Sequence, residues 1–318
     1  MGRAVVIAVV NHKGGCGKTT TVTNLGAALA AGSPEMGIVA NKVLIVDLDP
    51  RGNVATTFGV EKRSLGPTMN NLFEAVIDGS RIDPNPYILA PHELTKCMRR
   101  AWKRQNPDRP RGPPKGHFVD RLSLLPADLD LSGIEIELAM RIGREHRLKI
   151  ALEGAMDDYD LIIIDTPASL GLLTINALTA ADWLLIPIQA EFYALESMGQ
   201  LLDTLNKVQT AVNPKLRRLG ITMTMVQGGS NLGRTVADAA KRHFGGRILE
   251  THIPRSVAVA EAPLEGAPVA LSKSPIERHP GSLAYWNLAK EVSSRLEIIR
   301  TQRSVCLLYT SPSPRDPL

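Results

Sequence analysis

The stretch VVNHKGGCGKTTTVTNLG, residues 9–26, decides the fold class, because an apolar run leads through a glycine-rich turn into a helical pattern. Glycines let the backbone wrap around phosphate groups with its N–H groups turned inward. The N-terminus of the following helix adds partial positive charge. The pattern therefore predicts a phosphate-binding loop, in which Lys18 reaches the β- and γ-phosphates of a nucleotide and Thr19 ligates Mg²⁺.

The loop is expected to contact the nucleotide along its whole length. The residues concerned are Lys13, Gly14, Gly15, Cys16, Gly17, Lys18, Thr19 and Thr20. An ordinary loop of this kind needs one lysine, so Lys13 at the front edge requires a separate explanation. Taken alone, it could be a solvated loop lysine.

Further apolar, β-branched runs recur along the chain and alternate with helical patterns. The predicted strands cover 4–10, 42–49, 122–127, 160–167, 183–188 and 219–226, and the predicted helices cover 18–31, 132–155, 191–211, 231–244 and 283–300. Continuous apolar runs are typical of strands buried on both faces. The chain is therefore predicted to be an α/β protein with a mostly parallel twisted sheet and helices on both faces.

Three acidic residues follow predicted strands. Asp47 and Asp49 stand in LIVDLDPRGN (44–53), and Asp165 follows four apolar residues in IIIDTPAS (162–169). Ligands of parallel sheets bind beyond the carboxyl ends of the strands, so these carboxylates are expected beside the loop. There they can orient water or hold the shell of a Mg²⁺ ion.

Together these motifs resemble the deviant Walker A family of P-loop ATPases in the MinD superfamily, and more closely the ParA/Soj partitioning ATPases. The resemblance rests on KGGCGKTTTVTNL, VLIVDLDPRGN, YDLIIIDTPASLGLLTINAL, PIQAEFYALESMGQLL and IPRSVAVAEAP, which occur in the family's order. It covers roughly residues 3–300, interrupted by a basic segment.

The resemblance implies ATP and Mg²⁺ as cofactors and a homodimer that sandwiches ATP. Lys13 then reaches the partner's nucleotide and supplies in trans the charge that an arginine finger supplies elsewhere. Lys13, Lys18 and Asp49 become the catalytic residues, with Asp49 positioning water.

The resemblance also places Thr19, Asp47 and Asp165 around Mg²⁺, with Asp165 as the Walker B acid. It places Pro254 and Arg255 in a loop near the nucleotide base.

The partners implied by the resemblance are nonspecific DNA and a ParB-like, centromere-binding protein that stimulates slow hydrolysis. Release from DNA after hydrolysis would drive plasmid or chromosome partitioning. The expected location is the cytoplasm, on the nucleoid, with no membrane partner. Three alternatives stay open: a MinD-like ATPase that cycles on a membrane, an electron-transfer ATPase like the nitrogenase iron protein, and a nonenzymatic nucleotide-bound scaffold.

The chain departs from the family at several positions. Arg51 stands where the family usually has Gln, and Cys16 where Val or Ile is common. Arg51 adds a charge that could change turnover. Cys16 is either a small apolar filler or a redox thiol. Gly229 and Ala258 stand where arginines often contribute to DNA binding.

A basic segment supplies all of the chain's net positive charge. The formal charge is +5, whereas residues 96–121 sum to 9 − 2 = +7, so the remainder sums to 5 − 7 = −2. The segment is predicted to be a Pro/Arg-rich insertion, about 92–121, and RQNPDRPRGPPKG (104–116) within it is predicted to be neither helix nor central strand. It could bind DNA phosphates, with Trp102 stacking on bases or meeting a membrane surface, or it could simply be solvated.

The insertion is expected to interrupt a single P-loop ATPase domain over 1–303. The remainder, 304–318, contains CLLYTSPSPRD, which looks like the translation of an adapter used in preparing DNA libraries. It is predicted to be non-native. The three cysteines, Cys16, Cys97 and Cys306, have no pairing or metal-ligand spacing.

Overall fold

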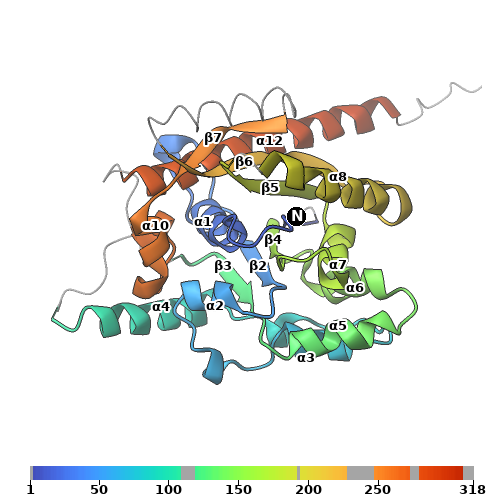
Figure 1. Ribbon diagram of the computed structural model, residues 1–318, viewed down its shortest axis with the longest axis horizontal. Helices are drawn as coiled ribbons and strands as arrows, with labels where there is room; N and C mark the ends of the chain where they lie inside the picture. The colour runs from blue at the N-terminus through green and yellow to red at the C-terminus, as the bar shows by residue number, and fades with distance from the viewer. Residues whose placement is uncertain (1–2, 109–118, 192–193, 228–246, 273–278, 311–318) are drawn as a thin grey trace, which may run out of the picture.

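The protein is built around a seven-stranded parallel sheet (Figure 1). The computed structural model describes residues 3–108, 119–191, 194–227, 247–272 and 279–310. The strands are β1 (Val5–Val9), β2 (Val43–Asp47), β3 (Leu122–Leu125), β4 (Leu161–Asp165), β5 (Trp183–Gln189), β6 (Arg217–Val226) and β7 (Ile248–Pro254). Their order across the sheet is β3-β2-β4-β1-β5-β6-β7, and every pairing is parallel. The predicted fold class is confirmed.

The strands form where the continuous apolar runs lie, because both faces of the sheet are covered. β2, β3 and β4 are buried at every residue. The seventh strand was not predicted. β7 buries Ile248, Leu249 and Ile253, but the polar residues Glu250, Thr251 and His252 interrupt it, so it lacks a continuous apolar run.

Helices cover both faces of the sheet (Figure 1). One hydrophobic core contains residues of α3 (Met69–Ala75), α5 (Leu131–Ala139), α6 (Arg147–Ala151), α7 (Leu172–Ala180) and α8 (Ala194–Ala211). The other contains residues of α1 (Lys18–Ala31), α2 (Asn53–Thr57), α4 (Pro91–Gln105), α11 (Val269–Ser272) and α12 (Pro280–Thr310). α10 (Val257–Glu261) follows β7 and packs on the same side as α12.

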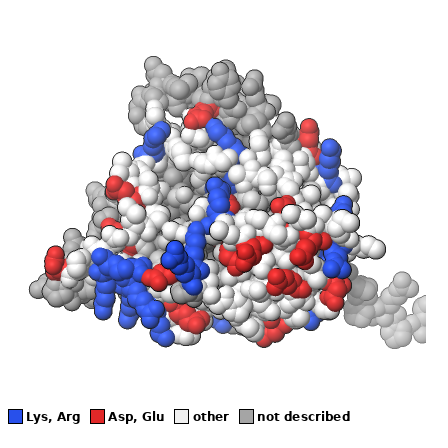
Figure 2. All heavy atoms as spheres, turned by 60° about the horizontal axis from the view of Figure 1, so that its bottom comes forward, with Lys and Arg blue, Asp and Glu red and all other residues white. Residues whose placement is uncertain are grey.

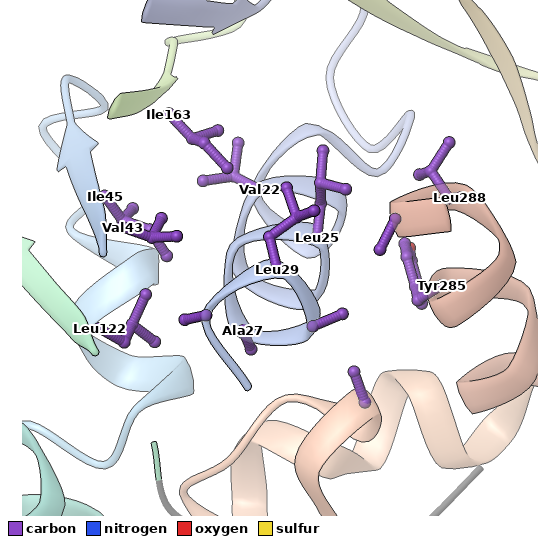
Figure 3. Packing of buried hydrophobic residues seen from close by; sticks show 14 of the residues in the cluster. Val22, Leu25, Ala27, Leu29, Val43, Ile45, Leu122, Ile163, Tyr285 and Leu288 are labelled. Atoms are coloured by element: carbon purple, nitrogen blue, oxygen red, sulfur yellow. The ribbon is translucent and has the colours of Figure 1, made fainter. Parts of the chain in front are cut away.

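Helix α1 lies at the centre of the second core. Figure 3 shows Val22, Leu25 and Leu29 of α1 between sheet residues, such as Ile45, and α12, which contributes Tyr285. All five side chains are at most 1% exposed. A Cβ at Gly26 would come within 2.8 Å of Ile45 Cδ1, so glycine lets the helix approach the sheet closely. This packing fixes the N-terminus of α1, where the loop ends.

Two sequence-based predictions of local structure were wrong. The single helix expected over 132–155 is broken, since Gly143 adopts a left-handed φ of 66° between α5 and α6. The basic segment was expected to be a long loop, yet its first half forms α4, which ends at Gln105 near the start of the proline-rich stretch. The helix predicted over 231–244 lies outside the described residues.

Within the ranges that the structure describes, no helix is both long and apolar enough to cross a bilayer.

Candidate active site

The glycine-rich loop lies between β1 and α1, at the carboxyl edge of the sheet. Gly15 and Gly17 have φ values of 73° and 87°, in the left-handed region that favours glycine. Thr224 Oγ1 of β6 donates a hydrogen bond to the Cys16 carbonyl at 2.8 Å, which ties the loop to the neighbouring strands. The loop therefore has a defined shape, with the N-terminus of α1 behind it.

Cys16 lies on the buried side of this loop. It is 0% exposed, and burial raises the pKa of its thiol despite the nearby charge of Lys18. A raised pKa disfavours the reactive thiolate, so the environment fits an apolar filler better than a redox thiol. Cys16 and Cys97 are both free thiols.

The two lysines of the loop have different surroundings. Lys18 is 6% exposed, and its Nζ donates a hydrogen bond to the Lys13 carbonyl at 3.2 Å. The Lys13 side chain is 34% exposed, and its Nζ forms an ion pair with Glu191 Oε2 at 2.6 Å. Lys18 is thus fixed within the loop, whereas Lys13 points to a carboxylate at the surface.

Thr19 and Asp165 meet at the position expected for Mg²⁺. Thr19 Oγ1 donates a hydrogen bond to Asp165 Oδ2 at 2.7 Å. Asp165 Oδ1 is buried and has no hydrogen-bond partner in the described part of the chain. Burial raises the pKa of Asp165 to about 7, although the bond from Thr19 and the charge of Lys18 oppose the rise. A hydroxyl and an unsatisfied buried carboxylate oxygen are suitable ligands for Mg²⁺.

Asp47 lies beside Asp165 but is already satisfied by the backbone. The two residues are register partners of β2 and β4. Asp47 Oδ1 accepts a hydrogen bond from the Asp49 N–H at 3.0 Å, and Oδ2 accepts one from Val54 N–H at 3.3 Å. Burial, and next the charge of Asp165, raise the pKa of Asp47 well above its usual range. Its contacts shape the turn after β2.

Asp49 is covered by Arg51. Arg51 Nη2 donates to Asp49 Oδ2 at 2.7 Å, and Arg51 Nε lies 3.1 Å from Oδ1 and 3.2 Å from Oδ2. This interaction raises the pKa of Arg51. The sequence suggested an added charge near the hydrolytic region but not that it would pair with Asp49.

Two neighbouring cavities adjoin the loop. One of about 350 Å³ is lined by Gly15, Gly17, Lys18, Thr19, Thr20, Arg51, Asn53, Thr56, Thr57, Met225 and Pro263. The other, of about 470 Å³, is mainly apolar and is lined by Pro254, Arg255 and Tyr285 together with Gly17 and Thr20. Their placement suits phosphates in the first and a base in the second. Pro254 and Arg255 therefore do lie beside the loop.

Met225 lines both cavities and was missed by sequence reasoning. Its φ of 55° is the only positive value among the described non-glycine residues. Non-glycine residues held in this left-handed backbone region are strained, and they are concentrated at functional sites. Glu191 was also missed as a partner of Lys13, because 178 residues separate the two in sequence.

Helix α4 corrects the interpretation of Trp102. Trp102 is 3% exposed and belongs to the buried side of α4, with Leu94, Met98 and Ala101. It is therefore unavailable for stacking on bases or for a membrane surface, and that expectation was wrong. The exposed side carries Lys96, Arg99, Arg100, Lys103 and Arg104. Figure 2 shows Lys and Arg side chains gathered at the left of this face, the side on which α4 lies in Figure 1.

Several residues considered from sequence lie outside the described ranges. They are Arg109, Arg111 and Lys115 of the basic segment, and Gly229.

Comparison with known proteins supports a nucleotide site. Residues 4–218 match a protein family described as an AAA domain. The chain is 40% identical over 289 residues to the sporulation initiation inhibitor protein Soj of Bacillus subtilis, covering 91% of this chain and 98% of that protein. It is 38% identical over 292 residues to the chromosome partitioning protein ParA of Caulobacter vibrioides, covering 91% and 94%.

A solved structure gives the same indication. Cobyrinic acid a,c-diamide synthase from Mycobacterium smegmatis, with bound ATP analog and magnesium, is 31% identical and has a TM-score of 0.67. The match covers 90% of this chain and 93% of that one.

Proposed function

Because the chain belongs to the ParA/Soj family of AAA-domain ATPases, we propose that it is a DNA-partitioning switch whose ATP-bound homodimer binds DNA nonspecifically. Family membership confirms the resemblance seen in the motifs. It also confirms that the protein is an ATP hydrolase that uses ATP and Mg²⁺. The dimer, the DNA and the order of events are proposals.

The loop and the adjacent strand ends have different roles in the reaction. Lys18 and the loop N–H groups bind the phosphates, while Thr19 and Asp165 hold Mg²⁺, which when bound neutralises charge on the β- and γ-phosphates. Asp49 orients the water that attacks the γ-phosphorus. The bond to the β-phosphate oxygen then breaks, and the products are ADP, inorganic phosphate and a proton.

The position of Lys13 is the observation that carries the dimer. Lys18 already occupies the place of the phosphate-binding lysine within the chain, whereas Lys13 projects from the front edge and is 34% exposed. A second cation there can reach a nucleotide held by another copy. Lys13 would exchange its ion pair with Glu191 for a contact with the γ-phosphate of the partner's ATP. Dimerisation then depends on ATP, since ADP lacks that group.

The exposed stripe of α4 is the proposed DNA surface. Its cations stand at 96, 99, 100, 103 and 104, a spacing of i, i+3, i+4, i+7 and i+8 that places them on one side of a helix. The core residues Leu94, Met98 and Trp102 hold the opposite side. Arg104 also pairs with Glu61. A row of cations on a fixed helix can follow a phosphate backbone without reading bases.

A ParB-like protein bound at a centromere-like site is the proposed stimulator of hydrolysis. Loss of the γ-phosphate dissolves the dimer and releases DNA. Repeated binding and release would keep the protein on the nucleoid and move its cargo.

The test is binding to random-sequence duplex DNA with ATP or ADP, across a salt series. The test variant replaces Lys96, Arg99, Arg100 and Lys103 with Gln. The matched control replaces Arg141, Lys149, Lys207 and Lys290, which are exposed cations elsewhere. Binding should require ATP and Lys13 and should fall steeply with salt. The α4 variant should lose roughly three to four units of the log–log salt slope, about 0.9 for each phosphate contact.

Two results would contradict the proposal. Absence of DNA binding in either nucleotide excludes the partitioning mechanism, and ATP-dependent binding to anionic liposomes would then favour the MinD-like alternative. Equal losses in the α4 variant and the control would exclude α4 as the DNA surface.

A further inference from the structure

Arg51 covers the carboxylate of Asp49. The Arg51 N–H donates to Asp49 Oδ1 at 3.1 Å. The guanidinium adds one contact through Nη2 and two through Nε, at 2.7 to 3.2 Å. Arg51 thus donates hydrogen bonds to the carboxylate from both its backbone and its side chain.

These contacts use the acceptor capacity of the carboxylate. An ionised carboxylate has about four lone-pair sites. Oδ1 faces the Arg51 N–H and Nε, and Oδ2 faces Nε and Nη2. The Nε–H is shared between the two oxygens, so three N–H groups occupy most of the acceptor sites of Asp49 and restrict the approach of water while this arrangement persists.

Arg51 also separates Asp49 from the cavity. Arg51 lines the cavity that Lys18 and Thr19 share, whereas Asp49 does not. The Asp49 side chain is 4% exposed and the Arg51 side chain is 60% exposed. The guanidinium therefore lies as a movable cover over a buried carboxylate, and the side chain can swing without disturbing the core.

We propose that Arg51 is a positioning residue that restrains ATP hydrolysis by occupying the Asp49 carboxylate until the guanidinium moves away. This inference rests on the proposed role of Asp49 in orienting water. The γ-phosphate of bound ATP offers the guanidinium another anionic partner across the cavity. Hydrolysis then proceeds only in the fraction of molecules in which Asp49 is uncovered.

The kinetic test compares basal ATP hydrolysis, without DNA or a partner protein, in three variants. Arg51→Gln should raise kcat roughly three- to tenfold, because a partly exposed charged pair biases an equilibrium by about that factor. KM should stay within about twofold. Arg51→Lys keeps the charge but lacks the planar fork, so kcat should rise less. Arg63→Gln removes an exposed arginine nearby and should leave kcat unchanged.

A second measurement detects the pair without nucleotide. Thermal unfolding of the nucleotide-free protein is compared for Arg51→Gln, Asp49→Asn and the double variant. If the side chains interact as described, the loss in Tm of the double variant is smaller than the sum of the two single losses. Additive losses would contradict the contact itself.

The outcomes separate this inference from the proposed function. If Asp49→Asn hydrolyses ATP normally, Asp49 does not orient water and both statements fail. If Asp49→Asn is inactive but Arg51→Gln has an unchanged or lower kcat, the restraint alone is overturned. If Arg51→Gln is faster and Asp49→Asn abolishes that gain, the restraint acts through Asp49.

Discussion

The floor and the rim of the active site differ in the burial and the pairing of their charged side chains. The floor consists of Lys18, Thr19, Asp47 and Asp165, which are fixed by strand ends and by α1. Lys18 and the two aspartates are at most 6% exposed. The rim consists of Lys13 and Arg51, whose side chains are 34% and 60% exposed. Each rim cation is paired with a carboxylate of its own chain, Glu191 or Asp49.

The difference indicates which contacts can change during a cycle. On the floor, the buried Asp165 Oδ1 has no partner within the described residues, so a ligand can be added without breaking a contact there. On the rim, an ion pair must be exchanged before Lys13 or Arg51 can act on a nucleotide. The partly exposed Lys13–Glu191 pair is of a weak kind, typically below about 1 kcal/mol, so exchange of that pair costs little.

Of the changes predicted here, loss of the floor cation Lys18 should have the largest effect, and it should act on ATP affinity. Lys18→Ala removes a charged donor to the phosphates, so ATP affinity should fall roughly 10- to 100-fold or more. Titration with a fluorescent ATP analogue measures this. Lys149→Ala, an exposed lysine on α6, is the control. An affinity within twofold of the parent protein would contradict the role of the floor.

The floor should also make stability depend on pH. Asp165 has a folded pKa of about 7 against an ordinary value of 3.8, and the pKa of Asp47 is shifted in the same direction. The folded state therefore retains protons that the unfolded state has released. Its contribution to stability is fully present below about pH 4 and is lost as the pH rises through about 7.

The magnitude should be modest and attributable to this carboxyl group. In EDTA without nucleotide, the free energy of unfolding should fall by about 2 to 3 kcal/mol from Asp165 between pH 5 and pH 8. Asp165→Asn should flatten the dependence, and Asp108→Asn, an exposed aspartate, should leave it unchanged. A parent protein whose stability rises over this interval would contradict the buried, uncompensated floor.

A change at the rim should have the smallest effect. Glu191→Gln frees Lys13 from its ion pair, so ATP-dependent dimerisation should strengthen about two- to fivefold. Sedimentation of Asp49→Asn protein, which preserves ATP, gives the dissociation constant. Glu137→Gln on the exposed side of α5 is the control. A weaker dimer in Glu191→Gln would mean that Glu191 supports the active arrangement.

Sequence could predict the floor because its residues are local to strand ends. Asp165 follows a continuous apolar run and Lys18 follows a glycine-rich turn, so each position follows from nearby residues. The six predicted strands are confirmed for the same reason. The rim partner Glu191 was not predictable, because it meets Lys13 only when β5 lies beside β1.

The errors have equally physical causes. The prolines and cations of the basic segment favoured a loop over a helix. The apolar residues Leu94, Met98 and Trp102 nevertheless have the spacing of one helix face. β7 has three consecutive polar residues, Glu250, Thr251 and His252, so it lacks the continuous apolar run by which the other strands were predicted. Whether residues 304–318 are foreign, and whether 1–303 is one domain, stay predictions.

The most direct test of the central claim is the molecular mass in solution, measured by light scattering on the Asp49→Asn protein with Mg²⁺. We predict a dimer with ATP, a monomer with ADP, and a monomer in both nucleotides after Lys13→Ala. A monomer with ATP, or a dimer that forms equally well without Lys13, would contradict the account.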